Sequence, residues 1–248
     1  MSVPAADIEA IERATIAGVS PSAVEEIGDW LLPFDAGTIG RARSAVPLRH
    51  ERCDPAEISE IEARYRARDL RHSFRLADVA PLEPLRDELR RRGYAENQQT
   101  LVQSASCEAM RRASDAAPAQ IAAAPDGSWA ATFSGEGFDP VDAAHRVGAF
   151  GRAPGALFAS VREDADAIAV GVAALSQGWA GVHGMRTARA RRGEGLAGRV
   201  LAGLAGAALA RGVARAFLQV QEENAAARAL YRRAGFTTLW RYAYWQQP

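Results

Sequence analysis

The sequence predicts an α/β protein in which helices cover a mixed β-sheet, and three observations carry this prediction. Short apolar runs alternate with stretches of helical periodicity through the second half of the chain. Glycines follow the ends of these helical stretches, where they stop a helix. A glycine-rich turn with the sequence RRGEGLAG, residues 191–198, joins a predicted strand to a predicted helix.

Composition places the 248-residue chain among soluble globular proteins, with 48% hydrophobic and 24% charged residues. The formal net charge is zero, so we expect no nucleic-acid partner. Acids stand near the N-terminus where a signal peptide has bases, and we expect a cytoplasmic protein with no membrane partner. Cys53 and Cys107 form neither a disulfide framework nor a metal-binding pair, so we expect no metal. Every basic residue is Arg, which excludes a catalytic lysine.

The elements of the first half are predicted from apolar runs and from the residues that interrupt or end them. The expected elements are strands over 30–34 and 39–48, a helix over 55–69, a strand over 73–77, a helix from residue 83 that ends at Gly93, and a strand over 98–106. The Ala-rich stretch 109–127 carries two prolines and no strand pattern. We therefore interpret it as the connection between a domain of residues 1–115 and a domain of residues 116–248.

The second half is predicted in more detail. The expected elements are a strand over 129–133, a helix over 139–150, strands over 156–164, 167–177 and 179–188, a helix over 194–211 that ends at Gly212, a strand over 215–221, a helix over 224–234 that ends at Gly235, and a strand over 237–245. Gly181 and Gly184 interrupt the strand over 179–188, which predicts a bulge or a close backbone approach there.

The glycine-rich turn contains Gly193-x-Gly195-x-x-Gly198, the spacing of a dinucleotide-binding turn. Glu222, at the end of the next strand, stands where such a fold places its acid. Two observations count against this interpretation: five residues separate the strand from Gly193, and most of the predicted sheet precedes the turn. A turn that binds nothing is the other alternative.

A second motif follows the next strand, in the sequence LQVQEENAAARALYRRAGF over 218–236. Together with RGEGLA over 192–197, it resembles the GNAT N-acetyltransferase superfamily, and the resemblance covers roughly residues 126–248. It implies a GNAT acetyltransferase fold in the C-terminal half and acetyl-CoA as the acyl donor. It also implies direct transfer, in a ternary complex, to the primary amine of a small-molecule or peptide acceptor.

The resemblance assigns the candidate site residues. The coenzyme A pyrophosphate is expected on the N-terminus of the helix after Arg192, where unpaired amides face an anion. Pantetheine is expected along the preceding strand, Asn224 begins the following helix, and Tyr231 is expected as general acid toward the departing thiolate. The cofactor-binding residues are Met185, Arg186, Thr187, Arg192, Gly193, Glu194, Gly195, Leu196, Ala197, Gly198 and Asn224.

Several assignments stay open. The base that deprotonates the amine could be His183, Glu222, Glu223 or a water relay to bulk solvent. Tyr242, Tyr244 and Trp245 in the last strand either wall an acceptor pocket or belong to the core. The alternative function is a non-catalytic acyl-CoA-binding or regulatory protein, and a nicotinamide-dependent oxidoreductase comes third.

The first half imitates part of the second. The stretch DELRRRGY over 87–94 resembles ALYRRAGF over 229–236, and alignment of the two glycines places Leu89 at the position of Tyr231. This resembles tandem GNAT proteins, and it implies a partial, degenerate GNAT-like N-terminal domain. We expect that domain to shape the acceptor site, with Arg41 and Arg43 as contacts to an anionic substrate group or as ordinary surface residues. The sequence leaves a homodimer open.

Overall fold

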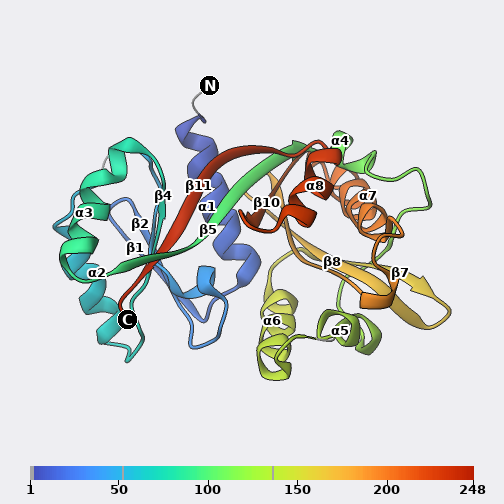
Figure 1. Ribbon diagram of the computed structural model, residues 1–248, viewed down its shortest axis with the longest axis horizontal. Coiled ribbons are helices and arrows are strands. Elements are labelled where there is room, and N and C mark those ends of the chain that lie inside the picture. Colours follow the sequence, from blue (N-terminus) through green and yellow to red (C-terminus); the bar gives the residue numbers. More distant parts are fainter. Residues whose placement is uncertain (1–2, 52, 136) are drawn as a thin grey trace.

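The computed structural model describes residues 3–51, 53–135 and 137–248 (Figure 1). In chain order the elements are α1 (Ala5–Val19), β1 (Ala23–Ile27), β2 (Trp30–Phe34), η1 (Gly40–Arg43), β3 (Val46–Pro47), α2 (Glu57–Arg66), β4 (Phe74–Ala77), η2 (Ala80–Leu82), α3 (Glu83–Arg91), β5 (Ala95–Ser106), α4 (Cys107–Arg111), β6 (Gln120–Ala122), α5 (Gly127–Phe133), α6 (Pro140–Arg152), β7 (Ala156–Glu163), β8 (Asp166–Ser176), β9 (Trp179–Thr187), η3 (Arg189–Arg191), α7 (Leu196–Leu209), β10 (Arg215–Gln221), α8 (Ala225–Arg233) and β11 (Thr237–Gln246).

The strands form two sheets. The larger sheet has the strand order β4-β11-β5-β10-β9-β8-β7-β6, and the smaller has the order β1-β2-β3. In the larger sheet β9 and β10 pair in parallel, while the other neighbours pair antiparallel. The predicted mixed α/β architecture is therefore confirmed, and the largely antiparallel pairing differs from the parallel sheet of a dinucleotide-binding fold.

The middle of the large sheet combines strands from both halves of the chain. β5, from the first half, lies between β10 and β11 of the second half. On its other side, β11 pairs with β4 of the first half. β5 and β11 run side by side through the centre of the molecule (Figure 1). The two halves are thus joined by interleaved strands.

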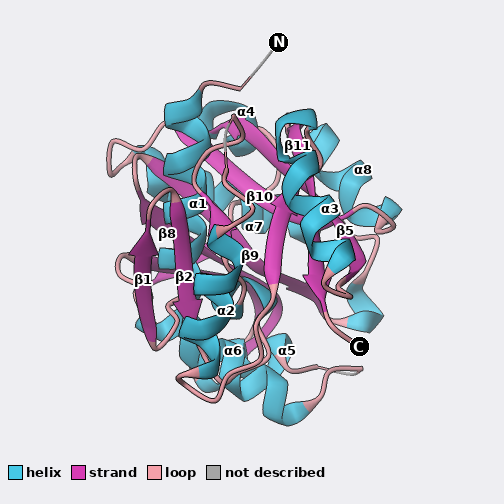
Figure 2. Cartoon of the chain, turned by 90° about the vertical axis from the view of Figure 1, so that its left-hand side faces the viewer, coloured by secondary structure: helices cyan, strands magenta, loops and turns pink. Residues whose placement is uncertain are grey.

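Helices flank the strands (Figure 2), and the alternation of side chains along β8 decides what each face packs against. Ala169 and Ala173 join a core cluster with residues of α7. Val170 and Val172 join a different cluster that contains Trp129 and other aromatic residues of α5 and α6. α1 lies on the same side as α5 and α6, because a Cβ at Gly18 would touch Ala174 and His183. Among the described residues, no helix has both the length and the apolar character needed to cross a membrane.

The predicted strand over 129–133 is wrong, because these residues form helix α5. The Asp126 side chain caps the helix by accepting from the Trp129 amide at 2.8 Å. Trp129 and Phe133, four residues apart, stack with ring centroids 5.4 Å apart. The cap and the spacing outweigh the strand preference of the two aromatic residues.

Two further predictions need correction, and the first helix of the chain was not predicted. Residues 39–48 form η1 and the short strand β3 instead of one strand. The connection over 109–127 contains the end of α4 and an edge strand, β6. It also packs along α7, since the Ala119 amide donates to the Arg199 carbonyl at 2.9 Å. The helix α1, which buries Ile8, Ile11 and Ile16, was not among the predicted elements.

Candidate active site

The parallel strands β9 and β10 separate part-way along their length. They pair from Trp179–Val182 against Arg215–Leu218, although β9 continues to Thr187 and β10 to Gln221. The register of β9 against β8 shifts beside Gly184, whose φ is +59°. The predicted irregularity is therefore a β-bulge at Gly184, and it turns β9 away from β10.

A cavity of about 260 Å³ lies where the strands part, and we name it the β9–β10 cavity. Its walls come from β9, β10, α5, α6, α8 and η1. The lining residues are Arg41, Phe133, Phe138, Arg146, Phe150, Val182, His183, Gly184, Met185, Arg186, Gln219, Val220, Gln221, Asn224, Ala227 and Tyr231.

Tyr231 lines this cavity from the second turn of α8. Its ring packs on Phe236 with centroids 5.9 Å apart, and 8% of the residue is exposed. Burial raises the pKa of Tyr231 to about 12. Its hydroxyl makes no hydrogen bond with any described residue, so a protonated donor faces the cavity without an internal acceptor.

Asn224, Met185 and Arg186 also line the β9–β10 cavity. The Asn224 side-chain oxygen caps α8 by accepting from the Ala227 amide at 3.1 Å. The Arg186 guanidinium lies over the Phe138 ring, 4.2 Å from its centroid. The structure therefore brings these predicted residues together with Tyr231.

His183 is 4% exposed on the floor of the cavity. Its Nδ1 atom lies 3.5 Å from Arg41 Nη1, and its Nε2 atom has no partner among the described residues. Burial and the charge of Arg41 hold the pKa of His183 well below its usual value. The imidazole is neutral at pH 7 and is a weak base.

The glycine-rich turn before α7 leaves its amides free. Gly193 and Gly195 have φ values of +88° and +76°, in the left-handed region that favours glycine. A Cβ at either would meet no atom within 4 Å. Amides 193–197 donate to no backbone carbonyl of a described residue, and the first such bond runs from Gly198 to Gly195 at 3.0 Å. A helix start with open amides is suited to an anion.

Gly198 and Glu194 have other roles in this turn. A Cβ at Gly198 would lie 2.6 Å from the Ala113 carbonyl oxygen, so glycine there permits close packing. Arg191 Nε donates to both Glu194 carboxylate oxygens at 2.9 and 3.0 Å. That hydrogen bond lowers the pKa of Glu194, and the guanidinium offsets its negative charge beside the amides.

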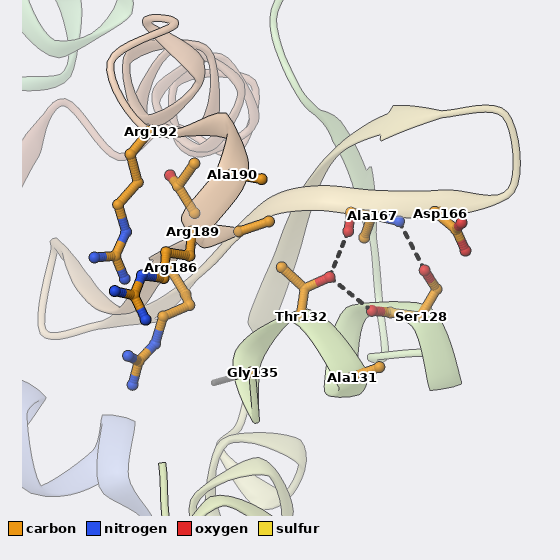
Figure 3. Close-up of a pocket in the computed structure, with 12 residues that line it drawn as sticks. Ser128, Ala131, Thr132, Gly135, Asp166, Ala167, Arg186, Arg189, Ala190 and Arg192 are labelled. Atoms are coloured by element: carbon orange, nitrogen blue, oxygen red, sulfur yellow. Dashed lines mark hydrogen bonds between the residues drawn. The ribbon is translucent and has the colours of Figure 1, made fainter. Parts of the chain in front are cut away.

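Three arginines gather next to the turn. Arg186, Arg189 and Arg192 extend their guanidinium groups on one side of a pocket of about 470 Å³, which we name the η3 pocket (Figure 3). Thr187 lines the same pocket. Burial and the charges of Arg192 and Arg146 lower the pKa of Arg186. A concentration of guanidinium groups is suited to phosphate. Arg186 lines both the η3 pocket and the β9–β10 cavity, and so connects them.

A family model described as "Probable histone acetyltransferase Rv0428c C-terminal" matches residues 5–245. The chain belongs to this family. It is an acetyltransferase of the GNAT type. The match to the family model includes the first half of the chain.

Relatives agree with this assignment. The chain is 28% identical over 243 residues to the uncharacterized N-acetyltransferase YobR of Bacillus subtilis (strain 168), and the match covers 96% of this chain and 98% of YobR. The GCN5-related N-acetyltransferase from Kribbella flavida has a TM-score of 0.72 at 19% identity, covering 100% of this chain and 96% of that one. A tandem GNAT protein from the clavulanic acid biosynthesis pathway has a TM-score of 0.64 at 15% identity, covering 97% and 92%. The two solved structures show a shared fold.

A second cavity of this acetyltransferase, about 320 Å³ in volume, adjoins the first and shares Arg41, Arg146, Gln219 and Gln221 with it. We name it the Arg41–Arg43 cavity. Its lining is Thr38, Ile39, Gly40, Arg41, Arg43, Gln98, Thr100, Arg146, Gln219, Gln221, Tyr242, Tyr244 and Gln246. Residues from both halves of the chain therefore line this cavity.

The open alternatives divide between the walls and the core. Tyr242 and Tyr244 line the Arg41–Arg43 cavity, whereas Trp245 is 1% exposed in the core of the first half. Glu222 and Glu223 line neither of these two cavities, and Glu222 lies 3.4 Å from Arg241. Among the described residues, no group of His, Cys, Asp and Glu side chains is arranged to hold a metal ion.

Sequence reasoning missed the aromatic wall of the β9–β10 cavity, which consists of Phe133, Phe138 and Phe150. Phe133 was assigned to a strand, and the loop that carries Phe138 was not assigned. The Asp126 cap and the four-residue spacing of Trp129 and Phe133 were the signals that could have found this wall.

Proposed function

We propose that this chain transfers an acetyl group from acetyl-CoA to a primary amine by direct attack in a ternary complex. One observation carries the proposal: the η3 pocket and the cavity at Tyr231 share Arg186, and Arg192 of the η3 pocket directly precedes the open amides before α7. Together these groups form the surface that we propose for the donor. An elongated donor with a diphosphate at one end and a thioester at the other matches that surface.

The residues fit coenzyme A by their chemistry. Amides 193–197, with Arg192, offer donors for the diphosphate. Met185, Arg186 and Thr187 form the end of β9 after the bulge at Gly184, where the strand no longer pairs with β10 and its backbone can accept an extended ligand. When bound, acetyl-CoA supplies the activated thioester.

Tyr231 holds its proton at Oη throughout the neutral range, because its pKa is raised to about 12. A thiol has a pKa near 8.5, so complete transfer of that proton to a thiolate is uphill by roughly 5 kcal/mol. Tyr231 therefore acts first as a hydrogen-bond donor to the developing negative charge on the leaving sulfur. This assistance is expected to increase the rate by about 10²–10⁴.

Deprotonation of the amine depends on solvent in this proposal. Among the residues that the structure describes, no carboxylate lines the β9–β10 cavity or the Arg41–Arg43 cavity. His183 has a strongly lowered pKa and a buried Nε2 atom, which makes it a poor base. A water relay through the open side of the Arg41–Arg43 cavity remains, or binding of the neutral amine itself.

We also propose that the first half is a degenerate GNAT unit. Its antiparallel strands β1-β2-β3, helix α2, strand β4, helix α3 and strand β5 follow the order of β7-β8-β9, α7, β10, α8 and β11. The parallel bridge between Ala45 and Phe74 stands where β9 pairs with β10. The first half of the chain lacks a counterpart of Tyr231.

Calorimetry with acetyl-CoA, free CoA and NAD tests the donor. We expect binding of both CoA species and none of NAD. We expect Arg192→Gln to raise the Kd for CoA by about 10-fold or more, from loss of a charged hydrogen bond. Arg211→Gln, at the other end of α7, is the matched control and should leave the Kd unchanged. Binding of NAD, or of neither CoA species, contradicts the proposal.

Thiol release from acetyl-CoA over a library of amines tests catalysis. An enzyme releases thiol with at least one amine at a rate well above that without acceptor. Binding of acetyl-CoA with no release across the library favours instead the second candidate, a non-catalytic acyl-CoA-binding or regulatory protein.

A further inference from the structure

The Arg41–Arg43 cavity continues the β9–β10 cavity away from the η3 pocket. The two share Arg41 and Gln219, whereas none of the Arg41–Arg43 lining residues belongs to the η3 pocket. A molecule that reacts next to Tyr231 can therefore extend into this second space without meeting the proposed CoA surface. The space is a candidate for the body of the acceptor.

The described residues that line this cavity carry positive charge and include no carboxylate. Arg41, Arg43 and Arg146 are its charged residues. Arg146 is paired with Asp142, at 2.9 Å. Arg41 and Arg43 form no ion pair with a described residue, so their charges are the ones left without a direct counter-charge.

Both guanidinium groups keep unused donors. An arginine has five N–H donors. Arg41 uses Nη1 for Gln219 Oε1 at 3.3 Å and for its contact with His183. Arg43 uses Nη1 for the Gly37 carbonyl at 3.4 Å. The Nε and Nη2 atoms of both make no hydrogen bond with any described residue, so a forked pair of donors remains for a ligand.

The nearby acids are engaged elsewhere. Glu12 is buried and pairs with Arg75 at 2.6 Å. Asp35 accepts from Ser22 and from the Gly37 amide, and lies 3.4 Å from His145. Neither lines the cavity. Gln219 is fixed by hydrogen bonds to Thr15 at 2.9 Å and Tyr242 at 2.8 Å, which holds the floor beside Arg41.

We propose that the acceptor is an amine that carries an anionic group, and that Arg41 and Arg43 bind this group. The inference rests on the proposed acetyltransferase function and adds the acceptor class. Planar guanidinium donors match carboxylate and phosphate oxygens in a bidentate geometry. A strongly basic peptide tail fits this cavity poorly, because its charge repels both arginines.

Acceptor pairs that differ in the anionic group test this proposal. Acetyl transfer is compared for glycine and glycinamide, 4-aminobutyrate and 4-aminobutyramide, and O-phosphoethanolamine and ethanolamine, together with a lysine-rich peptide. We expect kcat/KM at least 10-fold higher for the anionic member of one or more pairs, and the pairs distinguish carboxylate from phosphate. No anionic preference in any pair, or preference for the peptide, overturns the inference.

Variants test the assigned arginines. Arg41→Gln and Arg43→Gln are expected to reduce the anionic preference at least 10-fold through KM for the anionic acceptor, while the KM for acetyl-CoA is unchanged. Arg43→Lys should restore part of it. Arg49→Gln is the matched control, since Arg49 is exposed and pairs with Asp29 at 3.2 Å. A preference that survives in the double variant Arg41→Gln/Arg43→Gln overturns the assignment.

Binding separates this inference from the proposed function. Calorimetry with 4-aminobutyrate and 4-aminobutyramide, each in the presence of CoA, does not need turnover. Selective binding of the carboxylate, with no acetyl transfer to any amine of the library, supports the anion site and contradicts the enzyme proposal. Transfer without anionic preference contradicts the anion site alone. If no anionic compound is bound or acetylated, the anion site is overturned.

Discussion

The ends of helices α3 and α8 are nearly the same structure with different consequences. Gly93 and Gly235 follow these helices with φ values of +81° and +87°. The next amide, that of Tyr94 or Phe236, donates to the carbonyl of residue 89 or 231 at 3.0 or 2.9 Å. Both are helix stops of the Schellman type, and a strand follows each.

The difference lies at residue 89 and residue 231, which occupy equivalent places in the two helices. Leu89 is completely buried in the core of the first half, whereas Tyr231 lines the β9–β10 cavity. The local backbone motif therefore recurs without the chemistry. What makes the second copy a candidate active site is the separation of β9 from β10 beside it.

Separation of the two halves should give the largest effect. We expect a fragment of residues 116–248 to show no cooperative unfolding in urea, because β10 and β11 lose the strand β5 that lies between them. Co-expression with residues 1–115 should restore the transition. A fragment of 116–248 that unfolds cooperatively by itself would instead support the predicted boundary as an independent domain limit.

Removal of one hydroxyl from each copy compares their roles directly. Tyr231→Phe should reduce kcat by about 10²–10⁴ with little change in stability, since this hydroxyl bonds to no described residue. Tyr94→Phe should leave kcat within a factor of about three, but lower the unfolding free energy by about 1 kcal/mol. It removes a hydrogen bond of 2.8 Å to Glu62.

Steady-state kinetics measure kcat of both variants, and urea titrations measure their free energies of unfolding. Because the pKa of Tyr231 is about 12, its hydroxyl stays protonated up to about pH 10, and the wild-type rate should show no alkaline decline from this residue below that pH. Equal kcat for Tyr231→Phe and the wild type would remove Tyr231 from the mechanism.

The buried pair of Glu12 and Arg75 joins helix α1 to strand β4 and should matter far more than a surface pair on the same helix. Glu12→Ala leaves Arg75 buried without its counter-charge, which is expected to lower the unfolding free energy by about 3–5 kcal/mol. Asp7→Ala breaks an exposed pair with Arg215, with an expected loss of about 0–1 kcal/mol. Thermal and urea unfolding measure both, and similar losses would show that burial of the first pair is incomplete.

The packing of the connection on α7 is tested by two glycines of that helix. Gly203→Ala places a Cβ 2.6 Å from the Ala119 carbonyl oxygen and should destabilise the protein by about 1–3 kcal/mol. A Cβ at Gly206 meets nothing within 4 Å, and Gly206→Ala should stabilise it by up to about 1 kcal/mol. If urea unfolding gives both variants the same sign, residues 109–127 do not hold α7 in the way described.

Sequence periodicity predicted most elements of the second half, since helix and strand periods depend on local residue order. The stretch 127–133 was assigned wrongly because its aromatic residues favour strands, while a capping side chain just outside it decides the helix. The strand predicted over residues 39–48 was wrong for a tertiary reason. The Ala45 amide donates a hydrogen bond to the Ser73 carbonyl, and Gly40 packs on Tyr244.

The site was predictable where motifs carry it and not where distant segments meet. Tyr231, Asn224 and Arg186 lie on one cavity as their motifs suggested, although their roles stay predictions. Periodicity tells which face of a strand is buried, but not which strand becomes its neighbour. The placement of β5 between β10 and β11, and therefore the shared wall behind Arg41, could not be derived from sequence alone.

The interleaving of β5 also has a consequence during synthesis. β5 leaves the ribosome more than a hundred residues before β10 and β11, the two strands that flank it. Both edges of β5 therefore stay unpaired until those strands are synthesised. Pairings this distant along a chain form slowly, and unpaired strand edges promote aggregation. We therefore expect the nascent polypeptide to be prone to aggregation until β10 and β11 have emerged and cover the two edges of β5.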